Sequence, residues 1–358
     1  MRYPVLMISA ATLLSACCAA DEPQLPLPED TLAAIDVDQV KARLKQHKVS
    51  LNVSLTGPLV ALGRQLFFDP ILSEDNSVSC ATCHRPANGF AAPDAVAIGI
   101  RKQKGTRNTP TILNRALGKS QFWDGRADSL EEQSLKPIAN PLEMGSSVKA
   151  AVDRLKSSDR YPVLFEAAFD SKNNVPTISE TRLAQALAAF ERTLLTPPSI
   201  VDRFQDGDYS SLTKEQRQGL WIFESRGKCW KCHSGDNYSD ESFHNIGVSF
   251  AQANPDPGRS DVTGRESDLR RFRTPTLRQL TQTAPYMHDG SLKTLKDVVE
   301  FYNQGGSQGD SRLDPRIEPL GLSEAEVTQL VAFLKALSQQ ADSGKAAPEK
   351  AGLPTPGQ

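Results

Sequence analysis

The stretch Cys80-Ala-Thr-Cys83-His84 and its counterpart Cys229-Trp-Lys-Cys232-His233 decide how this chain folds. In each stretch two thiols lie three positions apart, and a histidine directly follows the second thiol. This spacing is typical of c-type haem attachment, because the thiols add to the haem vinyl groups and the histidine presents its imidazole to the iron. The two motifs predict two covalently bound haems, with His84 and His233 as axial iron ligands.

The N-terminal residues predict export. Arg2 precedes an uncharged, largely apolar run from Val5 to Ala16, which is too short to span a bilayer and is typical of a signal peptide. The run ends in Leu14-Ser-Ala-Cys17, which resembles the lipobox of bacterial lipoproteins. Residues 1–17 are therefore predicted to be a lipoprotein signal with an acylated Cys17, and the protein is expected in the periplasm, held to a membrane by its lipid anchor alone. Cleavage after Ala20, which gives a soluble periplasmic protein, is the alternative.

Two other uses of the paired cysteines must be weighed. Four cysteines in an oxidising compartment commonly form two disulfides, and Cys-x-x-Cys pairs also bind structural zinc. A histidine directly after each pair is not explained by disulfides, and two haem motifs leave no unpaired cysteine for a site of four thiolates. Haem attachment is favoured over both. The net charge of -2, without a basic run, gives no support for nucleic-acid binding.

Composition and helix signals predict a mainly α fold of two tandem cytochrome-c-like domains, each with one haem. Residues 18–35 are rich in proline and acidic residues and are expected to form a flexible tether. A proline-containing linker, Pro197–Asp208, separates the two haem motifs, so the predicted domains are 36–205 and 206–338. The tail 339–358 is rich in Ala, Gly, Pro and Lys and is expected to be disordered.

Three capping-box patterns predict helix starts, at Thr177–Glu180, Thr213–Gln216 and Ser323–Glu326. After the first of them, apolar residues recur at helical spacing on one face: Leu183, Leu187, Phe190 and Leu194. The pair Pro197-Pro198 is expected to stop that helix.

Six further blocks occur in a fixed order and carry a family resemblance. They are Leu66-Phe-Phe-Asp-Pro70, Lys104-Gly-Thr-Arg-Asn-Thr-Pro-Thr111, Phe122-Trp-Asp-Gly-Arg-Ala127, Asn140-Pro-Leu-Glu-Met144, Arg273-Thr-Pro-Thr-Leu-Arg278 and Ala284-Pro-Tyr-Met-His-Asp-Gly290. With the haem motifs, they resemble the bacterial di-haem cytochrome c peroxidase/MauG family over about residues 55–337. The resemblance implies that peroxide reacts at the N-terminal haem, while the C-terminal haem supplies or stores an oxidising equivalent.

The resemblance also implies roles for individual residues. Gln133 and Glu143 match the pair that faces the peroxide site, where a carboxylate can take a proton from peroxide and return it to the departing hydroxide. Trp123 matches the tryptophan that lies between the two haems, which makes it a candidate relay. Trp221 and Trp230 are expected to be haem-pocket or core residues.

Two departures from the cytochrome c peroxidases favour the MauG-like branch. Those enzymes often carry a histidine that caps the peroxide haem, and this chain has Ile100 in its place, which cannot bind iron. Tyr302 occupies the position of the tyrosine ligand of MauG-type enzymes, where the peroxidases have methionine. A phenolate is a hard donor that favours the higher oxidation states of iron. Met287 is the rival ligand, and His47 and His244 are not expected to be ligands.

The resemblance implies one bound Ca²⁺ as well. Asn108, Thr283 and Pro285 match positions that hold calcium between the domains, and oxygen donors suit this ion.

The function expected from these residues is that of a di-haem peroxidase that reacts with hydrogen peroxide and oxidises a partner protein. One alternative is a cytochrome c peroxidase that reduces peroxide with electrons from a small cytochrome. The other is a di-haem electron-transfer lipoprotein without catalysis. The reductant or protein substrate is expected in the periplasm.

Overall fold

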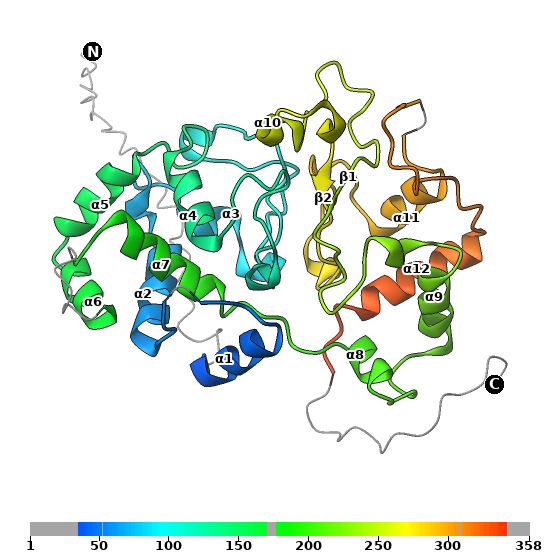
Figure 1. Cartoon of the computed structure of the whole chain (residues 1–358), viewed down its shortest axis with the longest axis horizontal. Helices are drawn as coiled ribbons and strands as arrows, with labels where there is room; N and C mark the ends of the chain where they lie inside the picture. The colour runs from blue at the N-terminus through cyan, green and yellow to red at the C-terminus, as the bar shows by residue number, and fades with distance from the viewer. Residues whose placement is uncertain (1–34, 52, 170–176, 308, 342–358) are drawn as a thin grey trace, which may run out of the picture. The chain divides into compact units, whose positions relative to one another are not determined.

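The computed structural model describes residues 35–51, 53–169, 177–307 and 309–341, and the chain from Asp36 onward forms one compact unit (Figure 1). The predicted signal segment, the acylation site Cys17, the tether up to residue 34 and most of the predicted tail lie outside the described residues. No helix in the described ranges is long and apolar enough to cross a membrane.

The described part is mainly helical, as the sequence predicts, with short turns of 3-10 helix between the α-helices. The α-helices are α1 Val37–Gln46, α2 Gly57–Phe68, α3 Cys80–Cys83, α4 Leu130–Ala139, α5 Val148–Lys156, α6 Tyr161–Ala168, α7 Glu180–Glu191, α8 Ile200–Gln205, α9 Lys214–Glu224, α10 Ser260–Thr263, α11 Leu295–Asn303 and α12 Glu324–Ala336. Two short strands, β1 Phe243–His244 and β2 Phe272–Arg273, pair antiparallel with Phe243 opposite Arg273.

Two of the three predicted capping boxes are confirmed. Thr213 caps α9 together with Gln216, and Ser323 caps α12 together with Glu326. The prediction for Thr177 was wrong by two residues, because the Ser179 hydroxyl accepts the Arg182 amide and makes Glu180 the first helical residue. Helix α7 also ends at Glu191. Leu194 is buried, but it belongs to the loop after the helix and not to the predicted helical face.

One close helix pair packs in each half of the chain. Helices α2 and α7 lie against each other beside the first haem motif, and α9 and α12 do so beside the second (Figure 1). A glycine permits each close approach, because a Cβ on Gly63 would overlap the carbonyl oxygen of Ala186, and a Cβ on Gly219 would overlap that of Gln329. Although the two halves share little sequence outside the haem motifs, they use the same packing device.

The prediction that Trp221 and Trp230 are core or haem-pocket residues was wrong. Trp221 is 62% exposed and Trp230 is 48% exposed. Helix α9 buries Gly219, Ile222 and Phe223, and Trp221 lies on a different, exposed face of this helix. Trp230 lies in the 3-10 turn Cys229–Lys231, between the two thiols, where its side chain meets solvent.

We expect Gly63→Ala to lower the free energy of unfolding by about 2 kcal/mol or more, because the added methyl group must push α2 away from the α7 backbone. Gly57→Ala, at the start of the same helix, is the matched control, since a Cβ there meets nothing within 4 Å. Urea unfolding of the two haem-loaded variants measures the difference. Equal unfolding midpoints would contradict this account of the helix contact.

Candidate functional site

The first haem motif forms the short helix α3, which the buried side chain of Ser79 caps together with Thr82. At its end, Nδ1 of His84 lies 3.0 Å from the carbonyl oxygen of Phe90. Because a carbonyl only accepts hydrogen bonds, Nδ1 carries the proton and Nε2 is left with its lone pair. Burial lowers the pKa of His84, so the imidazole is neutral, the form that binds a metal.

The second haem motif repeats this arrangement in a 3-10 turn. Nδ1 of His233 lies 2.9 Å from the carbonyl oxygen of Tyr238, and burial lowers the pKa of this imidazole too. The four cysteines of the two motifs are free thiols within the described residues. Each motif therefore presents two thiols and one metal-binding nitrogen, the donor set that c-type haem requires.

A cavity with about 1250 Å³ of space free of protein atoms, solvent at its mouth included, opens at His84. The residues predicted for the peroxide site all line it: Trp123, Gln133 and Glu143, together with Cys83 and His84. The Glu143 carboxylate accepts a hydrogen bond of 2.7 Å from the Asn140 amide. Burial raises the pKa of Glu143, while the positive charge of Arg126 and the Asn140 bond act against this rise. Glu143 is thus a half-buried carboxyl group that faces the cavity and can accept or donate a proton there.

Ile100 does not line that cavity. It is fully buried, and its backbone amide donates to the Glu143 carbonyl over 2.8 Å. The residue that replaces the expected histidine therefore supports the backbone of Glu143.

A second cavity, with about 1610 Å³ of free space including solvent at its mouth, surrounds His233. Tyr302 of α11 and Met287 both line it, so the cavity by itself does not choose between them. The Tyr302 hydroxyl has no hydrogen-bond partner among the described residues, whereas Tyr286, in the same cavity, donates to the carbonyl of Leu280 over 2.9 Å. Tyr302 is half-buried, and its hydroxyl is left available to a group that enters the cavity, such as an iron held by His233.

Trp123 lines both cavities and is 8% exposed. Its indole nitrogen donates to the carbonyl of Asn108 over 2.9 Å, which fixes the ring. Trp123 therefore lies on the wall of both cavities, and its role as a relay between two haems stays a prediction. The three residues predicted for calcium, Asn108, Thr283 and Pro285, also lie together on the wall of the His233 cavity.

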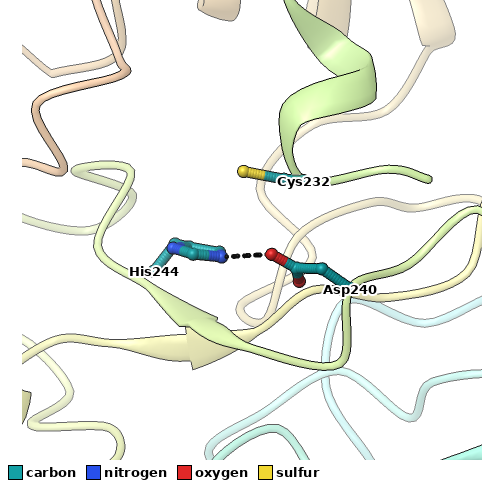
Figure 2. Close-up of side chains that lie close together, drawn as sticks. All are labelled: Cys232, Asp240 and His244. Carbon is teal, nitrogen blue, oxygen red and sulfur yellow. Dashed lines mark hydrogen bonds and ion pairs between the residues drawn. The ribbon is translucent and has the colours of Figure 1, made fainter.

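His244 forms a cluster with Cys232 and Asp240, the one group of three such side chains in the described ranges that could hold a metal ion (Figure 2). Both of its ring nitrogens are already engaged, Nε2 with Asp240 at 2.9 Å and Nδ1 with Asp314 at 2.8 Å. The Cys232 sulfur belongs to a haem motif. The cluster therefore holds a histidine between two carboxylates at the haem attachment site.

Sequence reasoning missed several residues that line the two cavities. Glu191 faces the His84 cavity from α7 without a hydrogen bond from its carboxyl group to any described residue, and burial raises its pKa to about 8. An acidic residue directly after Phe190, on a helix that buries nearly every position, was the signal that could have identified it. Arg126 lines the same cavity, stacks on the Phe122 ring and pairs with Asp124.

Comparisons with known proteins agree with this geometry. The family model described as di-haem cytochrome c peroxidase matches residues 58–210. The chain is 37% identical over 345 residues to the methylamine utilization protein MauG of Methylorubrum extorquens, covering 95% of this chain and 94% of that protein. This chain belongs to the di-haem cytochrome c peroxidase/MauG family.

Other relatives and one solved structure extend the likeness. The cytochrome c551 peroxidase of Nitrosomonas europaea is 38% identical over 282 residues, covering 78% of this chain and 80% of that protein. The crystal structure of a MauG-like protein associated with microbial copper homeostasis has a TM-score of 0.75 and 29% identity, covering 84% of this chain and 95% of that one. This family member is therefore a mainly helical protein with two haem domains and two c-type haems, and it is an oxidoreductase that acts on peroxide. The predictions of the family, the fold class, the haems and the enzyme class are confirmed. The alternative of a di-haem electron-transfer protein without catalysis is not supported.

Proposed function

We propose that this enzyme works as MauG-type proteins do, using peroxide to oxidise a partner protein rather than to draw electrons rapidly from a small cytochrome. The unpartnered hydroxyl of Tyr302 in the His233 cavity carries this proposal. A phenolate ligand stabilises higher oxidation states of iron, and such a site can hold an oxidising equivalent until a slow protein substrate arrives. The relationship to MauG over nearly the whole chain supports the same reading.

The residues have distinct roles in this proposal. Cys80 and Cys83 hold one haem with His84, and Cys229 and Cys232 hold the other with His233. A haem in each cavity supplies an iron that can bind peroxide or exchange electrons.

With a haem held at His84, the Glu143 carboxylate would accept a proton from peroxide and return it to the departing hydroxide, which would leave as water. Gln133 orients the peroxide from the same cavity wall by hydrogen bonding. Trp123, between the two cavities, passes electrons from one haem site to the other.

The second candidate is reduction of peroxide with electrons from a cytochrome, which the likeness to the cytochrome c551 peroxidase favours. Mixing the ferric enzyme with peroxide, with and without reduced cytochrome c, separates the two. The MauG-type function requires that both oxidising equivalents persist without a donor and that cytochrome c is consumed slowly. Rapid turnover of the cytochrome would establish the second function instead.

Three further features complete the proposal. The domain boundaries are placed at 36–205 and 206–338, with one haem motif in each half. The chain is exported to the periplasm and anchored through an acylated Cys17, which rests on the lipobox resemblance and which a mass spectrum of the mature N-terminus can test. One Ca²⁺ binds at Asn108, Thr283 and Pro285, supported by their common place on one cavity wall.

We expect Glu143→Gln to lower the rate constant for the reaction with peroxide by roughly 10²–10⁴-fold, because the amide cannot accept the proton. In the unmodified enzyme this rate should fall with decreasing pH, through a pKa above the ordinary value of 4.5, since burial favours the protonated and inactive acid. Glu143→Gln should lose that pH dependence. Stopped-flow mixing measures both, with the exposed Glu166→Gln as the control.

Tyr302→Phe should change the ferric spectrum of one haem only, because it would remove a single proposed iron ligand while all four thioether bonds remain. Tyr286→Phe is the matched control, a phenol in the same cavity whose hydroxyl is already hydrogen-bonded. Tyr302→His should likewise retain both haems and lose the capacity to store two oxidising equivalents. An unchanged spectrum in Tyr302→Phe would rule out the ligand assignment and leave Met287 as the candidate.

Removal of calcium should weaken the electronic coupling between the two haem sites. We expect a chelator to slow the reaction with peroxide, and added Ca²⁺, but not Mg²⁺, to restore it, since carbonyl and amide oxygens with several waters suit the larger ion. Metal analysis of the purified enzyme gives the independent readout. An enzyme without calcium that reacts at full rate would refute the site.

A further inference from the structure

The charged side chains that line both haem cavities are two buried arginines, Arg115 and Arg273. No acidic side chain of the described residues lines both cavities. The two guanidinium groups therefore lie at the junction of the two cofactor sites, next to Trp123, whose carbonyl accepts the Arg273 backbone amide over 2.8 Å.

One buried carboxylate serves both arginines. Arg115 binds Glu241 through two bonds of 2.8 and 3.1 Å, and Arg273 reaches the same carboxylate at 3.3 Å. Two positive charges against one negative charge leave the junction with a net charge of +1. Both arginines pair with Glu241, but this carboxylate offsets only one of the two positive charges, so the junction is suited to a second anion.

Arg273 has a donor left for that anion. Its Nε binds the carbonyl of Phe122 and its Nη1 binds Glu241 and the carbonyl of Thr274, but its Nη2 has no hydrogen bond to any described residue. The side chain is only 3% exposed and lines both cavities, so this donor is available to a group bound in one of them. Burial, together with repulsion from Arg115, lowers the pKa of Arg273 to about 9, which agrees with a cation short of negative charge.

Arg115, in contrast, is well supplied with partners. Besides Glu241, it donates from Nε to the Gln121 side chain over 3.0 Å and from Nη2 to the carbonyl of Ser120 over 2.6 Å. Its charge contributes to the junction while its hydrogen bonds hold the loop before Trp123. Of the two arginines, Arg273 is therefore the one with a donor, Nη2, that has no hydrogen bond to a described residue.

We propose that Arg273 binds a propionate carboxylate of the haems, and that its charge, backed by Arg115, raises the reduction potentials of both irons. A c-type haem is fixed to the protein at its vinyl groups and brings two propionates, which are the anionic groups that enter these cavities. A nearby positive charge favours the iron state that carries one more electron. The inference rests on the presence of the two haems and not on the peroxide chemistry.

The test is a redox titration of the haem-loaded protein, followed optically at each haem. Arg273→Gln should lower both midpoint potentials, and Arg273→Lys, which keeps the charge, should recover most of the shift. Glu241→Gln removes the opposing charge and should move both potentials upward. A merely structural disturbance would not produce shifts of opposite sign in two variants that alter the same ion cluster.

Folding is not expected to prevent the measurement, because Arg273→Gln leaves Arg115 and Glu241 as a balanced pair. Haem content confirms that each variant is loaded, and Arg160→Gln, an exposed arginine outside both cavities, is the control. If Arg273→Gln fails to retain haem, Arg273→Lys and Glu241→Gln carry the test. The propionate bending bands in the resonance Raman spectrum should also shift in Arg273→Gln.

Three results would overturn the proposal. Potentials that Arg273→Gln leaves unchanged would remove the electrostatic role, and a shift at one haem alone would show that the arginine is not shared. Potentials of the unmodified protein that vary with chloride at constant ionic strength would assign the site to a free anion. None of these results depends on whether the enzyme consumes peroxide, so failure of this inference and failure of the proposed function can be told apart.

Discussion

The hydrogen bond from each haem histidine to a main-chain carbonyl is the constraint on which the remaining structure depends. It runs from His84 to Phe90 and from His233 to Tyr238, and it closes the loop after each haem motif. The bond fixes the proton on Nδ1 and turns the other nitrogen toward a cavity. A helix pair with a glycine at its point of closest approach supports each cavity, so ring orientation, cavity and helix packing depend on one another.

The two cavities share this framework and differ in their chemistry. The His84 cavity contains carboxyl and amide groups, among them Glu143, Gln133 and Glu191, which can move protons. The His233 cavity is lined by Tyr302 and Met287, which can bind iron. The division of side chains between the halves matches a division between reaction with peroxide and storage of oxidising equivalents.

The halves meet through one half-buried and one buried ion pair as well as through Trp123. Arg107 of the first half binds Asp256 of the second through two bonds, and Arg115 binds Glu241. Such pairs contribute little net stability when intact but are costly to break, because a charge is then left without a partner inside the protein. The junction is therefore expected to hold one arrangement, which suits a route for electrons whose rate depends on distance.

The sequence alone determined the features that chemistry ties to local spacing. Two thiols three positions apart and a following histidine are typical of a haem site, and helix caps at Thr213 and Ser323 depend on residues three positions apart. The ordered blocks of the family pointed to Glu143, Trp123 and Tyr302, which line the cavities beside the haem motifs, and their roles remain predictions. Local spacing could not assign the faces of Trp221 and Trp230, because exposure depends on which helix packs against which.

Only the tertiary structure decided which charges lie between the haem sites. Arg115, Glu241 and Arg273 are distant in sequence, and no local pattern in their own segments shows that they share an ion cluster. Their burial and their shared carboxylate exist because the two halves meet there. Electrostatic energy inside a protein depends on burial and on the distance between charges, and neither quantity is encoded in neighbouring residues.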